Sequence, residues 1–147
     1  MDNIKNDKYY INQILDDIDK IIKYTSNVSY DDFMDDEQLI DAVLFRLIQM
    51  TENIKKLSIM FKEQHASVSW NDIVGFRNRI VHDYGKTDYT IVYEVVSNDI
   101  PDLKEVLLKI KWFAEKMEIR KYTKDLMILL TSILFGIINN LIGVIVV

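Results

Sequence analysis

The segment WNDIVGFRNRIVHDYG, residues 70–85, carries two side chains whose types and spacing could cleave a phosphodiester. Arg77 and His82 lie about one and a half helical turns apart. A neutral histidine can accept the proton of an attacking 2′-hydroxyl group. An arginine can stabilise the charge that develops on the phosphate oxygens. This chemistry needs no metal ion. A lone histidine is more often structural than catalytic, so the structural interpretation stays open beside the catalytic one.

Arg77 occupies an unusual position when the segment is drawn as a helix of about 100° per residue. It falls in the middle of an apolar arc formed by Trp70, Ile73, Val74, Phe76, Ile80 and Val81. Because a buried guanidinium is costly without a partner, this position favours a cleft or a contact with a second subunit. The alternative is a buried structural arginine that pairs with Glu52 of the preceding helix.

A polar strip adjoins this arc and carries Asn78 and His82, four residues apart on one face. Gly75 lies on the same strip, where its missing side chain allows a partner helix to approach closely. Tyr84 falls close to Arg77 on the wheel, seven residues later. The sequence therefore places one basic, one amide, one imidazole and one phenol group around one end of a single helix.

No other part of the sequence offers a better catalytic set. The chain has two histidines, His65 and His82, and no cysteine, so thiolate nucleophiles and the common structural zinc sites are excluded. The acidic pairs look like solvated helix ends, and a metal site built from them is improbable: Asp16–Asp17, Asp31–Asp32 and Asp35–Asp36.

The composition favours one folded helical domain in a reducing compartment. Of the 147 residues, 49% are hydrophobic, with one proline and four glycines. The absence of cysteine fits a cytoplasmic protein, and the polar start MDNIKNDKYYINQIL predicts no N-terminal signal peptide. The net charge of −5 excludes a general electrostatic grip on nucleic acid, so any RNA contact needs a local basic cluster.

Apolar residues spaced three and four apart predict an all-α protein, an antiparallel bundle of four to five helices. Ser69 is the expected N-cap of the helix that carries Arg77, and Gly85 suits the position after its end. Pro101 predicts a kink or a break in the last helix of the bundle. The expected helices cover residues 4–24, 36–62, 70–84 and 88–116, with an extra hydrophobic helix at the C-terminus.

The chain is predicted to divide into a helical domain, residues 1–120, and a hydrophobic segment, residues 121–147. Residues 126–147 carry no charge, and 16 of these 22 are apolar. A helix of that length reaches about 33 Å, enough to cross a hydrocarbon layer of about 30 Å. Basic residues before it would hold that end at the cytoplasmic face of the membrane. The alternatives are a buried C-terminal helix, an oligomer contact or an irregular end to the reading frame, and Asn139 and Asn140 weaken the membrane interpretation.

The stretch RNRIVHDY resembles the signature of the HEPN superfamily, in the form of its HepT branch: Arg77, four residues, His82, one residue, Tyr84. The similarity covers residues 8–117 and includes Trp70, Gly75 and Asp88 around the signature. It implies a helical bundle that forms a homodimer, with the motif helices facing each other and the active site in the cleft between them.

The resemblance also implies an activity, namely metal-independent endoribonuclease cleavage of RNA without a cofactor. Arg77 and His82 correspond to the catalytic pair, and Asn78 to the supporting polar residue. The branch supplies the toxin of a type VII-like toxin–antitoxin system. Its antitoxin is a minimal nucleotidyltransferase, which would transfer AMP from ATP to Tyr84 and so block the cleft.

Two features depart from the family pattern. The family often has Gly-Glu-Ala where this chain has MTEN, so Glu52 is retained without its neighbours. The hydrophobic segment after residue 120 is foreign to the pattern, and it raises a tether to the inner face of the membrane as a further hypothesis. The alternative function is a non-catalytic helical binding or dimerisation module that partners a nucleotidyltransferase. A membrane-anchored regulator is the third hypothesis.

Overall fold

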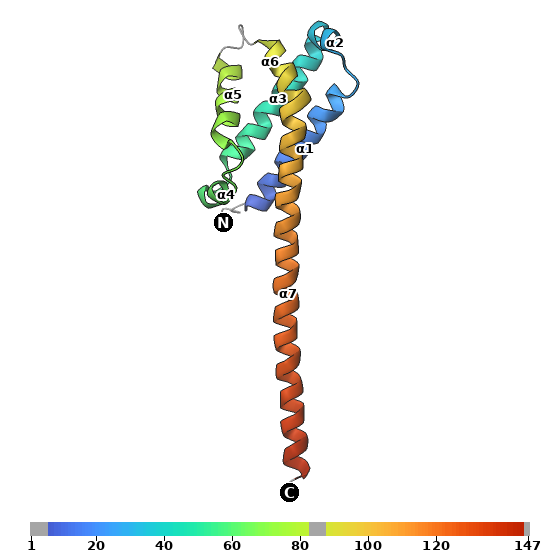
Figure 1. Ribbon diagram of the computed structural model, residues 1–147, viewed down its shortest axis with the longest axis vertical. Coiled ribbons are helices and arrows are strands. Elements are labelled where there is room, and N and C mark those ends of the chain that lie inside the picture. Colours follow the sequence, from blue (N-terminus) through green and yellow to red (C-terminus); the bar gives the residue numbers. More distant parts are fainter. Residues whose placement is uncertain (1–5, 83–87, 146–147) are drawn as a thin grey trace, which may run out of the picture. The chain divides into compact units, whose positions relative to one another are not determined.

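The computed structural model describes residues 6–82 and 88–145, and the side chains of residues 81, 82 and 136–145 are outside this description. Every regular element in these ranges is a helix and no strand occurs in them, which confirms the all-α prediction (Figure 1). The chain divides into two compact units, residues 1–108 and 109–147. The predicted boundary after residue 120 stays a prediction.

The first unit is built around two antiparallel helices, α1 (Asp7–Thr25) and α3 (Glu37–Lys55), which lie side by side (Figure 1). The short α2 (Tyr30–Asp35) joins them and packs on α3, and α5 (Trp70–His82) packs on another part of α3. The core side chains are fully buried aliphatic and aromatic residues, among them Ile14, Ile18, Ile21, Phe33, Leu44, Leu47, Met50, Ile54 and Ile80. Burial of these faces is the main stabilising contribution.

The long helix predicted over residues 36–62 is wrong in one respect, because it is interrupted after Lys55. Ser58 separates α3 from α4 (Ile59–Gln64) and caps α4, its side chain accepting from the Phe61 amide. Asp7 at the start of α1 fixes the break: one carboxylate oxygen accepts from the Ser58 amide and the other from its hydroxyl, each at 2.7 Å. Serine favours a cap over a helix interior, and the distant carboxylate satisfies the donors that the break exposes.

The break predicted at Pro101 is present and takes an unusual form. The short α6 (Tyr89–Glu94) continues into η1 (Val95–Asp99), one turn of π-helix, and then into α7 (Ile100–Ile145). Pro101 has no amide hydrogen and its ring crowds the carbonyl four residues earlier. A wider turn relieves this crowding, and the Ile100 amide donates to the Val95 carbonyl five residues before it.

The second unit begins at residue 109 and consists of the remainder of α7. Among the residues whose side chains are described, no helix is long and apolar enough to cross a membrane. This finding gives no support to a membrane contact through residues 126–147. Residues 136–147 belong to the part of that segment whose side chains are outside the description.

Candidate active site

Helix α5 is anchored at its first residue, Trp70, whose side chain is 6% exposed. The indole Nε1 donates to the carbonyls of Lys62 and His65, at 3.3 and 3.1 Å, and so ties α5 to the end of α4. The predicted N-cap Ser69 directly precedes the helix, and its carbonyl accepts from the Ile73 amide. Burial of Trp70 and Ile80 fixes which face of α5 meets α3.

The arginine on that face pairs with a carboxylate of α3. Arg77 Nη2 lies 2.8 Å from Glu52 Oε1, and the Arg77 side chain is 19% exposed. Lys55 Nζ reaches the same oxygen at 3.0 Å from one turn along α3. The hydrogen bond from Lys55, with the charges of Lys55, Arg77 and Lys56, lowers the pKa of Glu52 against the opposing effect of burial. Glu52 is thus held ionised between cations.

The guanidinium of Arg77 has further donors. Its Nη1 donates to Asn78 Oδ1 at 3.3 Å, so the structure brings Arg77 and the predicted supporting residue together. Its Nε is buried and has no hydrogen-bond partner among the described side chains and backbone groups. A buried donor without an acceptor is uncommon in proteins. Glu52 and Asn78 order the guanidinium, and Nη1 and Nη2 each carry a second N–H that these two contacts leave unused.

The remaining predicted site residues fall outside the described parts of the chain. His82 is the last residue of α5, but its side chain is not described, and Tyr84 lies wholly outside the described residues. Gly75 lies within α5, and a Cβ atom built on it would meet nothing within 4 Å. This chain therefore leaves open space at the position where the sequence predicts close approach of a partner helix.

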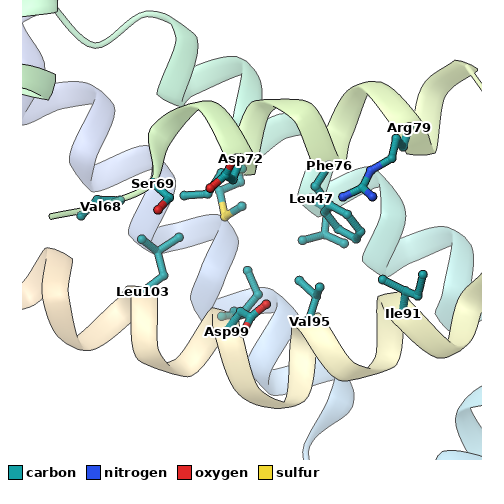
Figure 2. A pocket seen from close by; sticks show the side chains of 13 residues that line it. Leu47, Val68, Ser69, Asp72, Phe76, Arg79, Ile91, Val95, Asp99 and Leu103 are labelled. Carbon is teal, nitrogen blue, oxygen red and sulfur yellow. The ribbon is translucent and has the colours of Figure 1, made fainter. Parts of the chain in front are cut away.

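A separate groove lies on another side of α5 (Figure 2). It has a volume of about 370 Å³, with Leu47 and Met50 of α3 among its lining residues. Phe76 contributes from α5 and Val95 from η1, so the π-helical turn shapes one wall. Its charged lining residues are Asp72, Asp99 and Arg79, and the Arg79 guanidinium carbon lies 5.8 Å from the centre of the Phe76 ring. Arg77 is not among the lining residues, so the groove and the Arg77–Glu52 pair are distinct features of one helix.

The electrostatics distinguish these two sides of α5. Two carboxylates in the lining of the groove oppose a phosphodiester, and the remaining lining is mostly apolar. On the other side the carboxylate of Glu52 is outnumbered by Lys55 and Arg77. A phosphate anion is therefore better accommodated beside Arg77. Within the described ranges, no three acidic, histidine or cysteine side chains gather where they could hold a metal ion.

Comparison with known proteins decides the family. The profile described as "Ribonuclease HepT-like" matches residues 14–129. The chain belongs to the HepT-like ribonuclease family. The match includes α3 and α5, so Glu52, Arg77 and Asn78 all lie within the family region.

Two relatives match this chain over all or almost all of their own length. A protein of Caldanaerobacter subterraneus subsp. tengcongensis, named "putative RNase", is 32% identical over 74% of this chain and 100% of its own length. A protein of Thermococcus cleftensis, named "probable ribonuclease HepT", is 27% identical over 73% of this chain and 97% of its own.

A longer relative comes from Methanocaldococcus jannaschii and is named "gamma-glutamylcyclotransferase and putative RNase". It is 36% identical over 80% of this chain, which spans 53% of its length. This chain therefore covers about half of that protein. No solved structure matches the chain significantly.

Sequence patterns missed two features of this HepT-like chain. Lys55 stands three residues after Glu52 in a helix, a spacing that brings opposite charges together, so its contact with the carboxylate could have been anticipated. The groove could not, because one wall is the η1 turn, and the period of apolar residues does not distinguish a π-helical turn from an α-helical one.

We expect Glu52 and Arg77 to be energetically coupled. A double-mutant cycle of Glu52→Gln and Arg77→Leu, measured by denaturant unfolding at neutral pH, should give a coupling of about 1 kcal/mol or less, because both side chains are partly solvated. The lowered pKa of Glu52 means that its contribution is present above the ordinary value of 4.5 and is lost as the pH falls through the folded-state pKa. A coupling that persists unchanged in acid would contradict the ion pair.

Proposed function

We propose that the chain is the toxin of a toxin–antitoxin system, an endoribonuclease that cleaves RNA without a metal ion. The observation that carries this proposal is the Arg77 guanidinium on a mostly apolar helix face, held by Glu52 and Asn78 through one N–H of each terminal nitrogen, with the second N–H of each left for a substrate. Membership of the HepT-like ribonuclease family supports it, as do the RNase names of its relatives.

In the proposed reaction, His82 takes the proton from a ribose 2′-hydroxyl and the 2′-oxygen attacks the adjacent phosphorus. The bond from phosphorus to the 5′-oxygen breaks and that oxygen takes a proton from the solvent, leaving a 2′,3′-cyclic phosphate and a 5′-hydroxyl end. Arg77 donates to the non-bridging oxygens as charge accumulates on them. Asn78 helps to orient the guanidinium through its 3.3 Å hydrogen bond to Nη1.

Glu52 fits this scheme as the residue that positions Arg77. A free arginine side chain would lose rotamer entropy on binding the phosphate, and the 2.8 Å contact with Glu52 restricts it in advance. The carboxylate would also repel the substrate, but Lys55 offsets that repulsion from the same helix. The net charge of −5 makes such a local cationic site necessary for a polyanionic substrate.

The active unit is proposed to be a homodimer in which α5 meets its copy. Gly75 supports this arrangement because its position opens onto free space within the chain. Neighbouring α5 residues Ile73, Val74 and Phe76 are only half-buried. Apolar surface beside a charged guanidinium is more favourable in an interface cleft than in free solvent.

Regulation is proposed to occur at Tyr84. A nucleotidyltransferase antitoxin would attach AMP from ATP to the phenol, two residues from His82, in a type VII-like system. The added phosphate would place negative charge and bulk beside the catalytic pair. The negative charge would repel RNA, and the AMP group would fill the space that RNA needs beside the catalytic pair.

Substitution of the catalytic pair tests the activity. His82→Ala and Arg77→Ala should each lower the rate of RNA cleavage by about 10²-fold or more, since each removes a group that acts in the transition state. Arg77→Lys should restore charge but only part of the rate, because the planar fork is lost. The measurement is cleavage of total RNA by the purified chain with excess chelator, with helical content and mass in solution as controls. Unchanged cleavage by His82→Ala would contradict the role of His82, whereas no cleavage by the unchanged chain would leave the non-catalytic binding module as the better hypothesis.

Co-expression with a candidate nucleotidyltransferase tests the regulation. Intact-mass measurement should show an increase of one or more AMP units, and the increase should vanish in Tyr84→Phe. Tyr89→Phe is the matched control. Tyr89 is the first residue of α6, and its substitution should leave the mass increase intact. Modification that survives Tyr84→Phe would place the acceptor elsewhere.

A further inference from the structure

The C-terminal part of α7, residues 109–135, exposes many large apolar side chains. As a single helix this unit has no second layer against which to bury them. The exposed large residues here retain between 47% and 68% of their accessible surface, from Leu130 to Tyr122. Soluble proteins seldom leave so much contiguous apolar surface uncovered unless it binds something.

Five of these side chains form one stripe along the helix. Ile119, Leu126 and Ile133 are seven residues apart, and Tyr122 and Leu129 stand three residues after the first two. This is the alternating spacing of three and four that defines the a and d positions of a coiled coil. The basic residues Arg120, Lys121 and Lys124 fall off the stripe, on the side of the helix that also carries the exposed Met127, Ile128 and Phe135.

The hydroxyl groups of Thr131 and Ser132, within the apolar stretch, do not need water as a hydrogen-bond acceptor. The Thr131 and Ser132 hydroxyls both donate to the Ile128 carbonyl, at 2.8 and 3.0 Å, so their donors are satisfied inside the helix. A partner could therefore cover this part of the surface without stranding these donors.

The exposed area of the stripe amounts to more than half of one side of a standard protein interface. Large side chains about half exposed offer on the order of 100 Å² each, so the stripe offers on the order of 500 Å². Flanking Leu130 and Trp112 add to it, although Lys116 lies 4.6 Å from the centre of the Trp112 ring. Each side of a standard protein interface contributes about 800 Å².

We propose that residues 119–133 form a coiled-coil contact with the same segment of a second copy of the chain. A self-complementary stripe fits its own copy by symmetry, because each a and d side chain meets its equivalents on the facing helix. A lipid surface would need no such stripe, only apolar character on the immersed side. This contact is independent of the α5 dimer proposed above. It would link two single chains, or two α5 dimers, through the second unit, so its loss halves the mass in either case.

The test compares two acidic substitutions two residues apart in the full chain. Leu126 lies on the stripe and Ile128 on the opposite side of the helix, and their exposures are 55% and 56%. Sedimentation equilibrium in detergent-free buffer should show Leu126→Asp at about half the mass of the unchanged chain, at a concentration where Ile128→Asp keeps the full mass. Neither residue belongs to a packed core, so helical content should not change.

Two results would overturn the proposal. Equal mass for all three proteins would show that the stripe makes no contact between copies. An equal loss in both variants would show general apolar association. Flotation with phosphatidylglycerol–phosphatidylethanolamine vesicles tests the remaining alternative, a lipid surface. Vesicle binding that both substitutions abolish alike, with no contact between copies through the stripe in solution, would assign the surface to lipid.

Discussion

The cost of placing a guanidinium on a mostly apolar helix face is the constraint on which the site depends. Desolvating Arg77 without a partner would be strongly unfavourable, and the 2.8 Å contact with Glu52 offsets that cost. The contact works only if α5 lies against α3 in one register. Trp70 provides that register by anchoring the first residue of α5 to two carbonyls at the end of α4. The interaction that offsets the desolvation of Arg77 thus also holds the side chain in place for the proposed chemistry.

Helix α3 serves the core and the site with neighbouring residues. Met50 and Ile54 are fully buried, while Glu52 between them points to the side where Arg77 and Lys55 meet it. Rigid helices position a charged pair more closely than loops do. The interruption after Lys55 matters for the same reason. It redirects the chain into α4, where the Lys62 carbonyl accepts a hydrogen bond from the Trp70 indole. The Asp7 carboxylate stabilises the interruption by accepting from the Ser58 amide.

Much of this arrangement could be predicted from the sequence, and the failures have physical causes. The apolar period predicted the main helices, and the anomaly of Arg77 led to Glu52 as a candidate partner, which the structure confirms. The break at Ser58 was missed because Asp7, 51 residues earlier, stabilises it. The π-helical turn before Pro101 was predicted only as a break, since proline excludes the regular helix without specifying its replacement. The roles of His82 and Tyr84 derive from the family resemblance and stay predictions.

The central claim is that the Arg77 face of α5 supports cleavage by an internal 2′-hydroxyl rather than by water. The most direct measurement compares one RNA that the protein cuts with the same RNA carrying a 2′-deoxy substitution at the mapped cleavage position, with chelator present. The account predicts 2′,3′-cyclic phosphate and 5′-hydroxyl ends on the first RNA and no cut at the substituted position in the second. Cleavage of both at equal rates, or 5′-phosphate products, would contradict it.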